Sequence, residues 1–140
     1  LASNQVEFSL LNRQIENSGL FTFCKEHGIT VIAYSPLAKG ILSGKYTPEN
    51  PPPGMRSRMY NENLLKRIQP LIQRLKEFGA RIGDKTTAQV ALNWAICKGC
   101  VVIPGAKNFH QAQENAAAQG WSLEHSEILE LDLLSSELAG

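Results

Sequence analysis

The sequence lacks the features that would place the chain in a membrane or on nucleic acid. No apolar run approaches the roughly 20 residues that a membrane-spanning helix needs. Runs of like charge are absent too, and a formal net charge of +1 provides no field that would gather nucleic acid. The N-terminal residues do not show the charged and then apolar layout of a signal peptide. We therefore expect a soluble intracellular protein with no nucleic-acid partner and no membrane partner.

Cysteine is scarce as well. Cys24, Cys97 and Cys100 are too few for a disulfide scaffold, and an odd number suits a reducing compartment. Cys97 and Cys100 have the spacing found in redox and zinc motifs, but no second pair completes such a site. We expect neither a metal site nor a redox centre here.

What is present is the composition of one ordinary globular domain, with 43% hydrophobic and 19% charged residues. Strand and helix patterns alternate along it. We expect strands at 5–10, 29–34 and 101–103, and helices at 18–28, 61–79, 86–99, 108–118 and 126–134. This order predicts an α/β fold with parallel strands. Because the apolar strand 29–34 shows no alternation, we expect helices to cover both of its faces.

Individual residues set the expected ends of the helices. Ser18 and Asn108 are candidate N-caps, and Thr86 with Gln89 forms a capping box. Pro70 should kink or split the helix in which it stands, and Gly79 should end that helix. The C-terminal helix is expected to pack on the outside, with the acidic residues 124–130 on a solvated face.

Three strands cannot close a barrel, and as an open sheet they leave both edges unpaired. Either further strands are missing from this sequence or a partner covers the edges.

Two strand ends carry turns suited to a phosphorylated ligand. One is YSPLAKG at 34–40, which begins a long passage, 35–58, with three successive prolines; loops of that length are often functional lids. The other is PGAKN at 104–108, which combines a close-approach glycine, a lysine and the start of a helix whose free N–H groups attract anions. Parallel α/β proteins bind ligands at the carboxyl ends of their strands, so we expect a phosphate there.

Three separated motifs, in the same order, resemble the aldo-keto reductase superfamily. They are NQVEFSLL at 4–11, YSPLAKGILSGKY at 34–46, and IPGAKN at 103–108 followed by QxxEN at 111–115. The resemblance covers essentially the whole chain. It implies the C-terminal half of a (β/α)8 TIM barrel, strands six to eight with flanking and terminal helices. Residues 1–140 would then be one partial NADP-dependent oxidoreductase domain that lacks its N-terminal half.

The resemblance also implies a cofactor, NADPH, and the residues that bind it. Gln5 would hydrogen-bond the nicotinamide carboxamide, and Tyr34 would stack on the nicotinamide ring. The pyrophosphate and its covering loop would be lined by Ser35, Pro36, Leu37, Ala38, Gly40, Ser43 and Lys45. The adenosine end would meet Gly105, Lys107, Gln111, Glu114 and Asn115. Relatives often carry arginine where Gln111 stands.

Lys107 would lie beside the 2′-phosphate and favour NADPH over NADH by charge pairing. One arginine of residues 55–58 would also contact the cofactor. The sequence does not decide whether it is Arg56 or Arg58.

The catalytic group that the family uses is a tyrosine acid assisted by a lysine, an aspartate and a histidine, all on the first four strands and their loops. None of those positions falls in this chain, so we expect no catalytic residue among residues 1–140. The implied activity of a longer parent is reduction of an aldehyde or ketone by hydride transfer. The alternative is a non-catalytic NADPH-binding module that regulates a partner. Relatives in cytosol and in plastids leave the compartment open.

Overall fold

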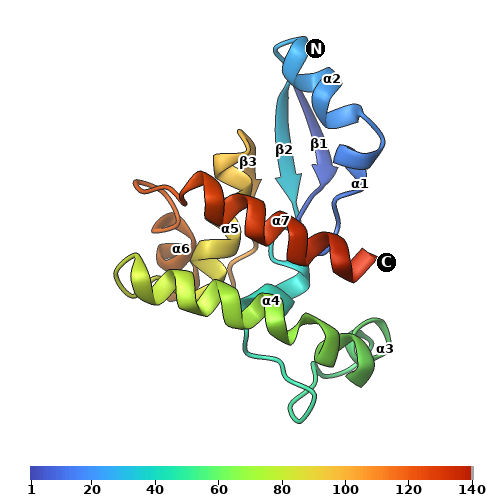
Figure 1. Cartoon of the computed structure of the whole chain (residues 1–140), viewed down its shortest axis with the longest axis vertical. Coiled ribbons are helices and arrows are strands. Elements are labelled where there is room, and N and C mark those ends of the chain that lie inside the picture. Colours follow the sequence, from blue (N-terminus) through green and yellow to red (C-terminus); the bar gives the residue numbers. More distant parts are fainter. Residues whose placement is uncertain (140) are drawn as a thin grey trace.

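The computed structural model of the chain describes residues 1–139 as a small parallel sheet backed by helices (Figure 1). The strands are β1 (Ser3–Glu7), β2 (Thr30–Tyr34) and β3 (Val101–Ile103). The helices are α1 (Gln14–Asn17), α2 (Leu20–Glu26), α3 (Arg56–Met59), α4 (Glu62–Arg81), α5 (Thr87–Cys97), α6 (Phe109–Ala116) and α7 (His125–Ala139). A 3-10 helix, η1 (Ala38–Ser43), follows β2. The expected α/β fold with parallel strands is confirmed.

The middle strand of the sheet is β2, which pairs in parallel with β1 on one side and with β3 on the other. Successive side chains of a strand point to opposite faces of a sheet. On β2, Val31 and Ala33 point to the helices and are buried at 4% and 0% exposure. The side chains between and beyond them point to the other face.

No helix among residues 1–139 covers that other face, which corrects the expectation that helices lie on both sides of β2. We call it the open face; it carries Gln5, Glu7, Ile32, Tyr34, Val101 and Ile103, which are matched in register across the three strands. Tyr34 is 40% exposed, Val101 51% and Ile103 44%. The open face is therefore an exposed, largely apolar surface among the residues described.

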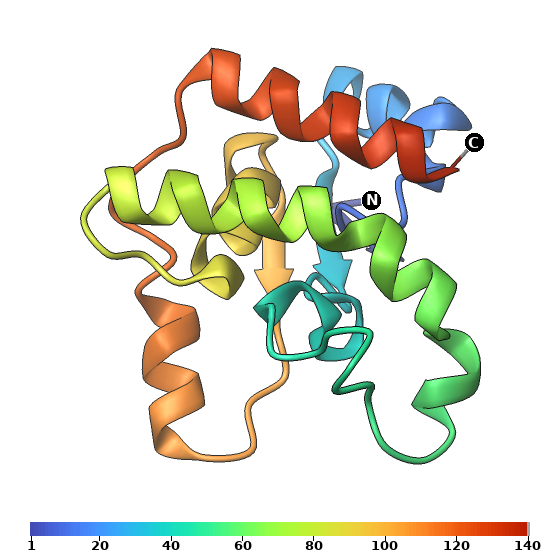
Figure 2. The same cartoon turned by 60° about the horizontal axis from the view of Figure 1, so that its bottom comes forward.

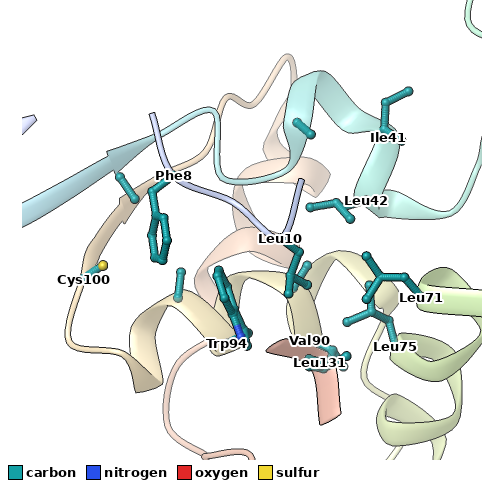
Figure 3. Packing of buried hydrophobic residues seen from close by; sticks show 14 of the residues in the cluster. Phe8, Leu10, Ile41, Leu42, Leu71, Leu75, Val90, Trp94, Cys100 and Leu131 are labelled. Carbon is teal, nitrogen blue, oxygen red and sulfur yellow. The ribbon is translucent and has the colours of Figure 1, made fainter. Parts of the chain in front are cut away.

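The core lies between the sheet and the helices (Figure 3). Phe8 follows β1 and packs its ring against Trp94 of α5, with ring centroids 5.0 Å apart. Both side chains are fully buried. The Trp94 indole Nε1 donates a hydrogen bond of 2.8 Å to Asp132 on α7, so its one polar atom is satisfied inside the core.

β1 ends three residues earlier than expected, because the residues that follow it pack into this core. The alternation continues through Phe8 and Leu10, but both side chains leave the sheet to pack against the helices. The backbone then turns through a bridge between Ser9 and Asn12 and enters the short helix α1, which was not predicted. Helix α2 is capped by Gly19 with no side-chain hydrogen bond, not by Ser18, which closes α1 instead.

Helix α4 is continuous from Glu62 to Arg81, so Pro70 does not split it. Figure 2 shows that α4 bends between its first turns and its longer C-terminal part, which is the kink expected of an internal proline. Gly79 does not end the helix. It is needed for a different reason: a Cβ at this position would lie 2.0 Å from the carbonyl oxygen of Lys85.

Helix α7 is tied to α4 by three arginines spaced seven residues apart. Arg67 donates to the carbonyl of Leu138, while Arg74 and Arg81 form ion pairs with acidic residues of α7. The expected solvated acidic face is therefore wrong in part, because Glu127 is only 5% exposed and is paired with Arg81. Leu131 of α7 is fully buried, so this helix also contributes to the core.

Candidate functional site

A cleft of about 650 Å³ opens at the carboxyl ends of β2 and β3. Figure 2 shows that the segments following these two strands leave the same end of the sheet, with η1 beside one and α6 at the end of the other. The cleft is lined by Tyr34, Ser35, Pro36, Leu37, Lys39, Gly40, Ser43, Lys45, Tyr46, Arg56, Ala88, Ile103, Pro104, Gly105, Ala106, Lys107, Gln111, Glu114 and Asn115. Segments far apart in the sequence thus meet at the edge where parallel α/β proteins bind ligands.

The wall after β2 is a strained turn. Ser35, Ala38 and Lys39 have φ angles of 50°, 49° and 56°, in the left-handed region that side chains other than glycine rarely adopt. Gly40 continues the turn at 93°. The turn is held by a hydrogen bond of 2.7 Å from the Ser43 hydroxyl to the Gly40 carbonyl. Ser35, Lys39 and Gly40 of this turn line the cleft, and strain of this kind concentrates at ligand sites.

Replacing Lys39 by glycine should therefore raise the free energy of unfolding, by about 1 kcal/mol, since glycine adopts this φ without a Cβ clash. The Lys39 side chain is exposed, so little packing is lost. Chemical denaturation of Lys39→Gly beside Lys76→Gly, an exposed helical position where glycine should destabilise, provides the check. A loss of stability in Lys39→Gly would show that the left-handed turn is not strained.

The N-terminus of α5 supports the same wall from behind. The Thr87 hydroxyl donates to the Ser43 carbonyl, and the predicted capping box of Thr86 and Gln89 is confirmed. The Gln89 side chain also reaches across to the carbonyl of Glu114 on α6, at 3.0 Å. Helix α5 therefore connects the two walls of the cleft and fixes their spacing.

The opposite wall is the turn between β3 and α6. Asn108 caps α6 by accepting a hydrogen bond of 2.9 Å from the backbone N–H of Gln111, as predicted. The side chain of Gln111 accepts from the backbone N–H of Lys107 at 2.8 Å, and Asn115 donates to the Gly105 carbonyl at 3.2 Å. These bonds hold the turn open toward the cleft and leave the Lys107 ammonium in solvent.

Most of the residues expected to bind a cofactor line this cleft; the exceptions are Gln5, Ala38 and Arg58. Ala38 is buried behind the turn, and Gln5 is exposed on the open face, on the same side of the sheet as Tyr34. Of the two arginines that the sequence left open, Arg56 lines the cleft and Arg58 does not. Arg56 is positioned by a hydrogen bond of 3.2 Å to the Lys39 carbonyl.

Some lining residues were not anticipated. Lys39 and Tyr46 lie within the 34–46 motif, several of whose other residues were predicted to bind the cofactor. Their position in that motif was the signal that could have identified them. Ala88 comes from the first turn of α5 and had no signal in the sequence. Charge in the cleft is mostly positive: Lys39, Lys45, Arg56 and Lys107 face a single carboxylate, Glu114. The Lys45 ammonium lies 4.9 Å from the Tyr46 ring centroid, which holds it at the cleft.

A second cavity of about 530 Å³ lies beyond the carboxyl end of β1. Glu7, Arg13, Ala38 and Tyr60 are among its lining residues, together with the end of α7. Burial raises the pKa of the Tyr60 phenol, and the charge of Glu7 raises it further. The higher pKa makes the Tyr60 phenol a weaker acid.

The cysteine pair lies away from both cavities. Burial raises the pKa of the Cys100 thiol to about 12, so the thiolate that metals and redox partners require is scarce at neutral pH. Among residues 1–139, no group of three or more His, Cys, Asp or Glu side chains is arranged to hold a metal ion. None of the helices described is both long and apolar enough to cross a membrane.

Comparisons with known proteins agree on one family. A model of the Aldo/keto reductase family matches residues 1–135. The chloroplastic pyridoxal reductase of Arabidopsis thaliana is 42% identical over 137 residues, which are 98% of this chain and 37% of the relative.

Two solved structures show the same likeness. An aldo/keto reductase from Klebsiella pneumoniae, in complex with NADP and acetate, is 29% identical with a TM-score of 0.68, over 96% of this chain and 39% of that one. A glycerol dehydrogenase from Gluconobacter oxydans has a TM-score of 0.87 at 23% identity, over 98% of this chain and 43% of that one, which shows a shared fold. This chain spans roughly two fifths of the length of these relatives. The resemblance seen in the sequence is confirmed, and the chain belongs to the aldo/keto reductase family.

Proposed function

We propose that this chain is the cofactor-binding, C-terminal part of a (β/α)8 barrel reductase that uses NADPH to reduce aldehydes or ketones. The observation that carries the proposal is the cleft at the carboxyl ends of β2 and β3, which gathers two of the three sequence motifs around a mostly cationic opening. The third motif supplies β1 at the edge of the same sheet.

The open face supports the partial barrel. In a closed (β/α)8 barrel, helices cover the outside of the sheet, and layers of side chains fill the inside. Here helices cover one face, while Tyr34, Val101 and Ile103 remain exposed on the other. The outer edges of β1 and β3 are also unpaired among the residues described. Additional strands of the same polypeptide would bury this face and pair both edges.

The residues present fit a dinucleotide that carries phosphates. The four cationic side chains of the cleft suit its negative charge, and the left-handed turn at 35–40 brings backbone close to the opening. We propose that Lys45, Arg56 and the turn bind the pyrophosphate. Lys107 would pair with the 2′-phosphate, while Glu114 and Asn115 hold the adenine.

At the other end, Tyr34 would stack on the nicotinamide ring and Gln5 would hydrogen-bond its carboxamide. Both side chains lie on the open face of neighbouring strands, two positions apart in register. When bound, NADPH supplies the hydride that reduces the carbonyl carbon. Residues of this chain would bind the cofactor and orient it, so that one face of the nicotinamide ring is presented to the substrate. The proton donor would lie outside residues 1–140.

The substrate proposed is a small aldehyde or ketone. Pyridoxal, named for the plant relative, is an aldehyde, and that relative matches almost the whole of this chain.

The test is a titration of the native-length polypeptide with NADPH, followed by an assay of NADPH oxidation with an aldehyde present. Saturable binding and aldehyde-dependent oxidation would support the proposal. Binding without turnover of any carbonyl compound would favour a regulatory NADPH-binding module, and absence of binding would overturn the cofactor assignment.

A further inference from the structure

Glu7 places a carboxylate on the open face. Neither packing of the fold nor the lining of the cofactor cleft explains why a charged residue stands there. It lies two residues after Gln5, so both side chains point to the same face of β1. In the register of the parallel pair, Glu7 is the direct partner of Tyr34. Neighbouring strands are about 4.8 Å apart. A negative charge therefore stands beside the ring-stacking tyrosine, at the carboxyl end of the sheet.

The charge of Glu7 is not neutralised by an ion pair. The salt bridges among the described side chains involve Glu16, Glu62, Glu77, Glu124, Glu127, Glu130 and Asp132, and Glu7 is in none of them. The cation of the adjoining cavity is Arg13, which is already paired with Glu16 and Asp132. Tyr60 also lines that cavity, and the charge of Glu7 contributes to the raised pKa of its phenol. The field of this carboxylate thus reaches into the space at the end of the sheet.

We propose that Glu7 is a positioning charge that makes the site bind oxidised cofactor more tightly than an uncharged side chain would, while leaving reduced cofactor almost unaffected. This inference rests on the proposed function, since it takes Gln5 and Tyr34 as the residues that hold the nicotinamide. No role for Glu7 in packing competes with it, because the side chain is half-buried at a cavity and outside the hydrophobic core.

The physical basis is the difference in charge between the two cofactor states. The nicotinamide ring is cationic when oxidised and neutral when reduced, whereas the phosphates are the same in both. A carboxylate near the ring attracts only the oxidised form, and partial burial between protein walls strengthens that attraction relative to bulk water. With cofactor bound, the same field would stabilise positive charge at the position of the ring.

The experiment measures dissociation constants of NADP+ and NADPH for the native-length polypeptide and for three variants. Glu7→Gln keeps the size of the side chain and removes its charge, and Glu7→Asp keeps the charge. Glu26→Gln, on the exposed side of α2, removes an equal charge far from the open face. We expect Glu7→Gln to weaken NADP+ binding about tenfold and NADPH binding less than twofold.

Glu7→Asp should retain most of the preference for NADP+, and Glu26→Gln should change neither constant. A Glu7→Gln variant that binds both cofactor forms as the unaltered protein does, or that loses both equally, would overturn the role of Glu7 and leave the cofactor assignment intact. A loss shared equally by both forms would indicate a structural role. If the unaltered protein binds neither form, the proposed function and this inference both fail.

Discussion

Replacing Gly79 by alanine should lower the free energy of unfolding by about 3 kcal/mol, at the upper end of the usual penalty for overpacking. Gly79 is a buried residue within α4, and its Cβ would be placed 2.0 Å from the Lys85 carbonyl oxygen and 3.0 Å from its carbon. Both neighbours are backbone atoms, so no side-chain rotation relieves the clash. The Gly79 carbonyl also accepts the backbone N–H of Lys85, at 3.0 Å, which ties the end of α4 to the turn before α5.

Chemical denaturation of the native-length protein measures this effect. Gly105→Ala is the matched control, because a Cβ there has nothing within 4 Å and the φ of Gly105 is not left-handed. We expect the control to unfold as the unaltered protein does. A Gly79→Ala variant as stable as the control would show that α4 and the 82–85 turn do not approach as closely as described.

Replacing Lys107 by alanine should weaken NADPH binding about 30- to 100-fold and NADH binding by no more than about twofold. A hydrogen bond between a lysine and a phosphate is charge-assisted, and loss of such a bond typically costs about 2 kcal/mol or more. Only NADPH carries the 2′-phosphate. The Lys107 side chain is exposed and its backbone N–H is bonded to Gln111, so the substitution leaves the turn intact.

Lys45→Ala is the informative comparison, since Lys45 lines the same cleft near the proposed pyrophosphate position. Both dinucleotides share that group, and we expect Lys45→Ala to weaken both to a similar degree. Equal losses of NADPH and NADH in Lys107→Ala would remove the 2′-phosphate assignment and with it the reason for preferring NADPH.

Local signals in the sequence predicted local structure well. The capping box at Thr86 and the cap at Asn108 are confirmed because each uses hydrogen bonds within one turn of helix. The parallel strands followed from the alternation of strand and helix patterns. The cleft followed from the rule that ligands lie at the carboxyl ends of such strands.

Features that depend on contacts between distant parts of the chain could not be predicted from local sequence patterns. The sequence pattern predicted that Gly79 ends a helix. Glycine is required there because the Lys85 backbone packs too closely to leave room for a Cβ, and no local pattern predicts that contact. Glu127 looked solvated because its burial depends on Arg81 of another helix. The unbroken apolar run of β2 predicted burial on both faces, but among residues 1–139 only the face that carries Val31 and Ala33 is buried.

We propose that the chain is the cofactor-binding part of a longer barrel. A typical (β/α)8 barrel takes about 250 residues, so at least roughly 110 more would accompany these 140. The most direct test is the intact mass of the native polypeptide from its source. The account predicts a mass well above the 15.4 kDa of this chain, near that of a complete barrel. A native mass of 15.4 kDa would contradict it.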